Sequence, residues 1–199
     1  MHVKGCMQTA TLLSAMLVET DWRHHIPYLL NTTRERTMKF EHLIEINDPL
    51  NPLIDTITRE QLWRGLVLRA EDPKRFIPHL DECIIGERES GSFTRRQRFG
   101  ELWIDDHVRL TPLEEVRFEV PAQGDIAQSL LTMRIEAHGD AMLLVRFTYD
   151  DGNPAEPTDE MSKMYEGIKK SAYQEADIDT VKIVRQLASE GKLDASYLN

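Results

Sequence analysis

Few polar residues in this sequence are placed where they could do chemistry inside a protein. His42 lies on the apolar face of the alternating segment Phe40–Ile46, where an imidazole can serve as an acid or a base near neutral pH. Glu175 and Asp179 are four residues apart, so on a helix they lie side by side and could share a raised pKa. Each has a simpler interpretation: His42 as a hydrogen-bonded core residue, and the two carboxylates as groups that face water.

Three tyrosines and one acidic segment complete the candidates. Tyr149, Tyr165 and Tyr173 carry hydroxyl groups that could orient a carbonyl inside a pocket or could reach its rim. In the segment 105–107 (DDH), neighbours on a strand point to opposite faces, so only the first and third residues could act together. Their alternation with apolar neighbours places them on the water-facing side, and we interpret this segment as a hairpin turn.

Familiar catalytic and cofactor motifs are absent from the sequence. It contains no G-x-S-x-G, Walker A, G-x-G-x-x-G or H-E-x-x-H pattern. Cys6 and Cys83 lie far apart without metal-ligand spacing, which also argues against a disulfide framework and favours a reducing, cytoplasmic compartment. We therefore predict no metal and no cofactor, and no catalytic residue is identified.

The composition is that of a globular protein, with 199 residues, 41% hydrophobic and 29% charged. This length allows a single domain with a sizeable core. The net charge of −10 argues against nucleic-acid binding, which requires a concentrated basic face, and against docking on anionic lipids. No segment is long and apolar enough for membrane insertion to be expected.

A long C-terminal helix, predicted over residues 158–191, is the element around which the rest must be arranged. Thr158 can cap its first turn, and Gly191 is a suitable stop. Apolar residues at spacings of three and four predict one stripe that the remainder of the chain must bury. The stripe consists of Met161, Met164, Tyr165, Ile168 and Ala172.

The preceding residues predict one strand, one helix with a short companion, and then about six strands. The first strand is Phe40–Ile46, and the helix begins at the capping box Thr58–Gln61 and continues to Ala70. Short connections between the later strands favour antiparallel pairing. These strands are Cys83–Glu89, Phe93–Phe99, Leu102–Ile104, Val108–Leu110, Val116–Val120, Ser129–Glu136 and Met142–Tyr149.

Alternation in the last three strands predicts a sheet with one apolar face and one charged face. The arginines on the charged face alternate with glutamates and threonines, so we interpret them as members of cross-strand pairs on a solvated surface. They are Arg98, Arg109, Arg117, Arg134 and Arg146.

The first 37 residues differ from the rest of the chain. Their apolar run Thr9–Val18 is too short to span a bilayer, and no clear cleavage site follows it. We expect residues 1–37 to be a poorly ordered arm or the product of an early start codon. The domain proper is then predicted over residues 38–191, followed by a tail over 192–199.

Four segments carry a resemblance to a known family. They are MKFEHLIEINDP (38–49), ITREQLWRGLVLRAEDPKRFIP (57–78), RRQRFG (95–100) and KSAYQEADIDTVKIVRQL (170–187). On these, the chain resembles the AtaL-like family (DUF1857) of the SRPBCC, or START/Bet v 1-like, superfamily. The resemblance implies an α+β helix-grip fold, in which a curved antiparallel sheet of about seven strands wraps a long C-terminal helix and leaves an apolar cavity.

The resemblance also implies a class of ligand, because superfamily members bind lipids, sterols or polyketides and some catalyse cyclisation. We predict binding of a small hydrophobic molecule between the sheet and the last helix. A cyclase or aromatase using His42 or Glu175, and a solid-cored interaction module, are the alternatives, and a homodimer through an edge strand is possible. The predicted ligand-binding residues are His42, Phe118, Met133, Val145, Phe147, Tyr149, Tyr165, Ile168 and Ala172.

Overall fold

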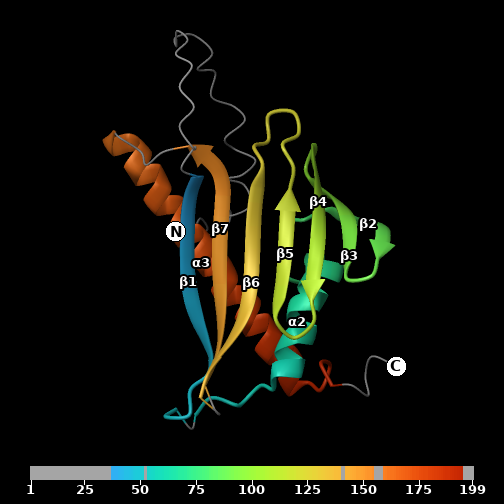
Figure 1. The fold of residues 1–199 in the computed structure, drawn as a ribbon, viewed down its shortest axis with the longest axis vertical. Helices are drawn as coiled ribbons and strands as arrows, with labels where there is room; N and C mark the ends of the chain where they lie inside the picture. Colours follow the sequence, from blue (N-terminus) through green and yellow to red (C-terminus); the bar gives the residue numbers. More distant parts are fainter. Residues whose placement is uncertain (1–36, 52, 140–141, 155–158, 195–199) are drawn as a thin grey trace, which may run out of the picture.

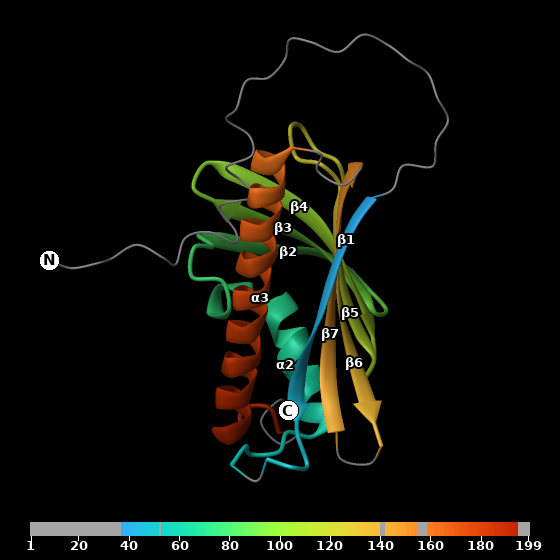
Figure 2. The same ribbon diagram turned by 90° about the vertical axis from the view of Figure 1, so that its left-hand side faces the viewer.

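The computed structural model describes residues 37–51, 53–139, 142–154 and 159–194, and these form a curved sheet against one long and one short helix (Figures 1 and 2). The α+β helix-grip architecture predicted from the sequence is confirmed. The strands are β1 (Thr37–Asn47), β2 (Glu82–Glu89), β3 (Ser92–Phe99), β4 (Leu102–Thr111), β5 (Glu115–Val120), β6 (Ser129–His138) and β7 (Met142–Pro154). The helices are α2 (Arg59–Glu71), the 3₁₀ turn η1 (Pro73–Arg75) and α3 (Glu160–Ser189).

All seven strands pair antiparallel in the order β1-β7-β6-β5-β4-β3-β2. The first strand therefore lies beside the last, and β1 and β2 are the edges of the described sheet. Residues 102–111, predicted as two short strands, form the single strand β4, because the segment 105–107 continues the ladder with β3 and Asp106 lies opposite Arg95. The interpretation of 105–107 as a hairpin turn is wrong.

The outer face of the sheet carries the predicted cross-strand ion pairs. Arg134 contacts Glu115 at 2.7 Å, and Arg146 contacts Glu136 at the same distance. Arg109 lies 3.2 Å from Glu119. These contacts confirm the predicted cross-strand pairs for Arg109, Arg134 and Arg146, although such pairs contribute little to stability individually. Arg117 instead lies 3.6 Å from Glu119 of its own strand.

Helix α2 begins where its capping box predicts. The Gln61 backbone N–H donates to Thr58 Oγ1 at 3.1 Å, and the Gln61 side chain accepts from the Thr58 backbone at 2.9 Å. Pro73 follows immediately after the helix and starts η1. The buried side of α2 includes Leu62, Gly65 and Leu66, and it packs against both α3 and the sheet (Figure 2).

Helix α3 starts at a different cap from the predicted one. Asp159, not Thr158, occupies the N-cap, and its carboxylate accepts from the Ser162 backbone at 2.8 Å. Thr158 itself lies outside the described residues. The helix ends as expected: Gly191 has a positive φ of 69°, and its N–H bonds the carbonyl of Ala188 at 3.0 Å.

The apolar stripe on the first half of α3 is more exposed than the sequence predicted. Met161, Met164, Tyr165 and Ile168 are 43–64% exposed, and only Ala172 of the predicted stripe is buried. Figure 1 shows why: the N-terminal end of α3 extends beyond the β1 edge of the sheet, so this stripe has no strand beneath it among the described residues. The prediction that the stripe is buried is wrong for its first four members.

The closed core lies where both helices cover the sheet. Its fully buried members include Leu66 of α2, Val184 of α3, and Met133, Val145 and Phe147 from the sheet. Within the described residues, no helix is both long and apolar enough to cross a membrane. The predicted N-terminal arm, apart from Thr37, falls outside the described residues, as does Cys6.

Candidate ligand-binding site

A pocket of about 310 Å³ is lined from both sides by the sheet and α3, at the end of the interior away from the closed core. Residues 76–79 and the last turn of α2 complete its walls. Its apolar lining is Phe76, Ile77, Pro78, Phe99, Ile104, Phe118, Val120, Leu130, Leu131, Ala172 and Ala176. Its polar lining is Arg69, His79, Arg95, Gln97, Asp106, Ser129, Tyr149, Asp150, Asp151, Tyr173, Glu175, Asp179 and Thr180.

One charged pair in the pocket wall has its hydrogen-bonding groups occupied by protein partners. Arg95 and Asp106 lie opposite each other on β3 and β4, and each is only 5% exposed. Arg95 Nε donates to one Asp106 oxygen at 2.9 Å, Nη2 donates to the other, and Nη1 donates to the carbonyl of Ala70 at 2.9 Å. Gln97 adds a further hydrogen bond to Asp106 at 3.1 Å. This bidentate pair ties the sheet to the end of α2.

A second arginine, Arg69 on α2, is held differently. Its Nε donates to Thr180 Oγ1 at 3.2 Å, and its guanidinium lies over the Phe118 ring at 5.4 Å from the centroid. Among the described residues, no ion pair and no hydrogen bond is found for its two Nη nitrogens. Burial lowers the pKa of the Arg69 guanidinium, and the charge of Asp177 opposes that shift.

Behind the pocket wall, Asp177 forms a buried cluster with Tyr149 and His42. The Asp177 side chain is 0% exposed, and its Oδ2 lies 2.8 Å from His42 Nε2. The Tyr149 hydroxyl donates to the two carboxylate oxygens at 2.9 and 2.7 Å. Burial raises the pKa of Asp177, and the hydrogen bond from His42 and the charge of Arg69 offset part of the shift.

The hydrogen bonds of this cluster determine whether Tyr149 presents a proton donor or an acceptor to the pocket. Burial and the neighbouring Asp177 carboxylate raise the pKa of Tyr149 well above its usual range, so its proton stays on the hydroxyl and is directed at Asp177. His42 Nδ1 is buried without a hydrogen-bond partner among the described residues, while Nε2 lies 2.8 Å from Asp177 Oδ2. Tyr149 therefore presents an acceptor oxygen to the pocket, not a mobile proton.

The rim of the pocket is acidic. Glu175 and Asp179 are exposed members of the lining on α3, and Asp179 pairs with Lys182 at 2.8 Å. Asp151 of β7 forms an ion pair with Lys169, whose ammonium group lies over the Tyr173 ring at 5.8 Å. Tyr173 stacks on Tyr149 with ring centroids 4.1 Å apart, so the aromatic wall extends from the interior to this rim.

Of the nine residues predicted from the sequence to bind a ligand, three line the pocket. Phe118 and Tyr149 come from the sheet, and Ala172 comes from α3. His42 does not line the pocket, but it contacts Asp177, which also binds the pocket residue Tyr149. The His42 ring stacks against Phe147 with ring centroids 5.3 Å apart. Its predicted alternative as a hydrogen-bonded interior residue is the arrangement found.

The other five predicted residues lie elsewhere. Met133, Val145 and Phe147 are each 0% exposed, and they belong to the closed core formed by the two helices and the sheet. Tyr165 and Ile168 are exposed on the first half of α3. None of the five is part of the pocket lining, so we do not retain them as ligand contacts.

The sequence interpretation missed the interior polar residues, although the pattern contained a signal for several. Arg95 and Gln97 occupy the same face of β3 as the buried Phe93, and Asp106 shares its face of β4 with the buried Val108. On α3, Asp177 is placed three and seven residues before the buried Thr180 and Val184. A polar residue at an inward position of an amphipathic pattern is the feature that could have identified them.

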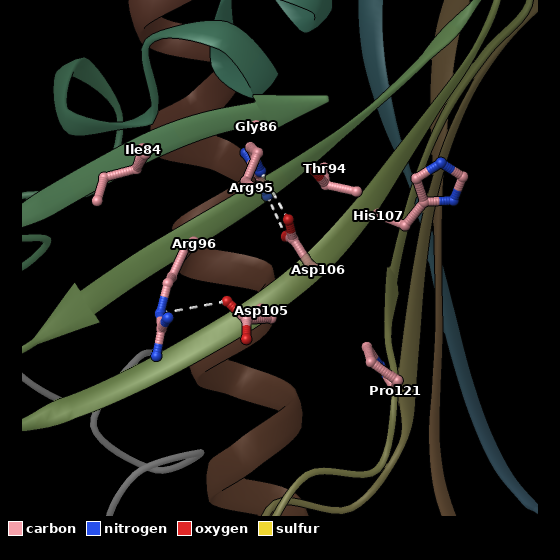
Figure 3. A pocket seen from close by; sticks show the side chains of 9 residues that line it. All are labelled: Ile84, Gly86, Thr94, Arg95, Arg96, Asp105, Asp106, His107 and Pro121. Carbon is pink, nitrogen blue, oxygen red and sulfur yellow. Dashed lines mark hydrogen bonds and ion pairs between the residues drawn. The ribbon is translucent and has the colours of Figure 1, made fainter. Parts of the chain in front are cut away.

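A separate hollow of about 360 Å³ lies over β2, β3 and β4 and is shown in Figure 3. The Arg96–Asp105 pair beside it spans 3.5 Å, and both side chains are 58% exposed. The hollow is also lined by the buried Arg95–Asp106 pair, which it shares with the inner pocket, so its charged groups are already paired with one another (Figure 3). In the described part of the chain, no group of three or more histidine, cysteine or acidic residues is arranged to hold a metal ion.

Comparison with solved structures places this fold in a known class. The Zhui aromatase/cyclase from Streptomyces sp. R1128 is 14% identical, with a TM-score of 0.51 over 81% of this chain and 98% of that chain. Norcoclaurine synthase from Thalictrum flavum, in complex with dopamine and hydroxybenzaldehyde, is 14% identical, with a TM-score of 0.53 over 83% and 98% of the two chains. These similarities show that the chain has the helix-grip fold.

The family can be stated more narrowly. Residues 44–191 match the AtaL family, described as acetylaranotin biosynthesis cluster protein L. The chain belongs to this family. A comparison with curated proteins finds no match.

Proposed function

We propose that the protein binds a small, mostly apolar molecule in the pocket between the sheet and α3. The observation that carries this proposal is the pocket itself, which persists beside a core that is otherwise closed. Its volume of about 310 Å³ is at the lower end of the range of about 300–1,000 Å³ typical of ligand pockets. Aromatic walls from Phe118, Tyr149 and Tyr173 suit a flat or cyclic ligand.

Cyclase- or aromatase-like catalysis has less support from the same geometry. His42 does not line the pocket, and Glu175 lies at its exposed rim. Tyr149 reaches the pocket, but its proton is donated to Asp177. None of these three groups is therefore placed as a ready acid or base, and binding is the simpler conclusion. A solid-cored interaction module is less consistent with a pocket of this size.

The first test is to look for a retained ligand. Native mass spectrometry of the protein purified from its own source should detect a small molecule bound in a one-to-one ratio. A panel of fatty acids, sterols and aromatic polyketides should contain compounds that raise the melting temperature, since a ligand that binds only the folded state stabilises it. The proposal fails if nothing is retained and no compound shifts the melting temperature.

A pair of α3 variants locates the binding site. Ala176→Phe places a large side chain in the pocket and should abolish the thermal shift. Gln174→Phe, two residues away and exposed on the same helix, makes the same type of change outside the lining and should leave the shift intact. Equal behaviour of the two variants would show that the ligand binds elsewhere.

A further inference from the structure

The pocket contains two arginines, and only one of them is neutralised by direct contact. Arg95 uses all three of its guanidinium nitrogens, two on Asp106 and one on the Ala70 carbonyl. Arg69 uses Nε alone, on the neutral hydroxyl of Thr180. In the part of the chain that the structure describes, its two Nη nitrogens have no protein acceptor. Because Arg69 lines the pocket, these two donors are available to a ligand that fills it.

The surroundings of Arg69 hold the guanidinium in place without satisfying it. The Phe118 ring supports one face of the group, and the Thr180 hydroxyl is itself anchored by donating to the carbonyl of Ala176 at 3.0 Å. The nearby Asp177 carboxylate is already occupied by His42 and Tyr149. A preorganised fork of two donors matches a planar group with two oxygens, as in a carboxylate or the enolate of a 1,3-dicarbonyl.

The rim determines which end of such a ligand goes inward. Glu175 and Asp179 are exposed carboxylates at the opening, so an acidic group left there would be repelled. Phe118, Leu131 and Ala172 provide apolar walls for the body of the molecule. Among the described residues, no carboxylate contacts Arg69 directly, so the interior position beside this cation suits the acidic end of the ligand.

We propose that Arg69 is the anchor of an acidic ligand, which enters the pocket with a carboxylate or enolate end first and leaves its neutral end at the acidic rim. This inference rests on the proposed function and specifies the substrate class for the same site. It assigns a binding role to a residue on α2 that belongs neither to the closed core nor to the Arg95–Asp106 pair.

The test compares two compounds of the same shape, 2-naphthoate and 2-naphthamide, by isothermal titration calorimetry at pH 7. Because hydrogen bonds to charged groups are stronger than neutral ones, the acid should bind the wild type tighter by on the order of tenfold to a hundredfold. Arg69→Met should bring the two affinities within about twofold, while naphthamide binding persists and shows that the pocket is intact. Arg69→Lys should keep part of the preference, since an ammonium group lacks the fork geometry.

A matched control separates a local contact from a general charge effect. Arg75, on η1, is exposed and pairs with Asp72 outside the pocket lining, so Arg75→Met removes one positive charge nearby without touching the site. This variant should keep the full preference for the acid. Equal affinities of the wild type for acid and amide, or a preference that survives Arg69→Met, overturn the inference alone. Failure of both compounds and of the wider panel to bind would overturn the proposed function as well.

Discussion

The interior between sheet and helices has two regions that differ in chemistry although the same elements build both. In the closed core, Leu66 of α2 and Val184 of α3 are both fully buried, and Val184 packs against α2 at Gly65. One turn along each helix, the corresponding positions are Arg69 and Thr180, and these line the pocket. The inward side chains therefore change from apolar to polar at neighbouring positions of the two helices, where Arg69 contacts Thr180.

The sheet makes the same transition. Phe147 of β7 is a fully buried core residue, and two residues further on the same face Tyr149 directs its hydroxyl to Asp177. Apolar side chains interdigitate and close the space, whereas charged and hydroxylated ones must keep fixed hydrogen-bond geometry and cannot collapse freely onto one another. In this protein, the interior polar residues therefore mark where a ligand can fit, and the apolar residues do not.

The largest expected effect separates the two pocket arginines. Arg95→Met leaves the Asp106 carboxylate buried without its cation and should lower the free energy of unfolding by about 3–5 kcal/mol. Arg69→Met removes one hydrogen bond to a neutral hydroxyl, the contact with the Phe118 ring and the attraction to Asp177, but no direct ion pair, and should cost less, about 1–2 kcal/mol. Urea denaturation of both variants measures the difference. Similar losses would mean that Arg69, too, is a structural residue.

The next largest effect tests the closed core. A Cβ atom added at Gly65 would lie 2.6 Å from Val184 Cγ1, so Gly65→Ala overpacks the contact between α2 and α3 and should cost about 1–3 kcal/mol. Trimming the opposing side chain in the double variant with Val184→Ala should restore part of this, as expected for coupled neighbours. Thermal and urea unfolding report the change.

Gly167 on α3 provides the control for that substitution. A Cβ there would meet nothing within 4 Å, so Gly167→Ala should instead stabilise the protein by roughly 0.5–1 kcal/mol through helix propensity alone. If both glycine substitutions have the same sign, packing between the two helices is not the cause.

The boundary between the two regions should show in the pH dependence of stability. The pKa of Asp177 is raised from its ordinary 3.8 in the folded protein, so above about pH 4 the folded state holds a proton that the unfolded chain has released. Stability contributed by this group therefore falls as pH rises towards the folded pKa, by at most about 1.4 kcal/mol per pH unit. Asp177→Asn removes that slope.

Urea denaturation of the wild type and of Asp177→Asn between pH 4 and 7 tests this sign. The stability of the wild type relative to the variant should decrease with rising pH. Asp179→Asn, an exposed change two residues away, should leave the wild-type slope in place. A wild-type advantage that grows with pH would show that the carboxylate is favoured, not penalised, by its surroundings.

Hydrophobic periodicity predicted the helices and strands, and the family resemblance implied their helix-grip arrangement, but neither predicted how the interior is divided into core and pocket. The capping box at Thr58 and the alternation of the strands are local features, so α2 and the sheet could be placed from the sequence. The position of α2 along the sheet depends on packing between distant segments. The same packing decides that Met133, Val145 and Phe147 are fully buried in the core while Phe118 lines the pocket. A pattern of inward residues cannot distinguish a closed core from a pocket wall.

Part of the polar interior could also be predicted from the sequence pattern. Arg95 and Asp106 sit at inward positions of neighbouring strands, which is where a buried pair must be. Arg69 had no such signal, because an arginine on an amphipathic helix is normally solvated, and only the arrangement of α2 against Phe118 and Thr180 shows that it is enclosed. That arrangement is a property of the tertiary structure and has no local signature in the sequence.

The smallest expected effect concerns the exposed apolar stripe at the start of α3, which belongs to neither the closed core nor the pocket. Ile168 is 43% exposed and outside the pocket lining, so Ile168→Gln should change the free energy of unfolding by no more than about 0.5 kcal/mol and leave ligand affinity unchanged. Leu187→Ala on the same helix, at a buried position, should cost about 2–5 kcal/mol. Weaker naphthoate binding by Ile168→Gln would instead show that the ligand extends along α3 past the sheet edge, and the site would then include the exposed stripe.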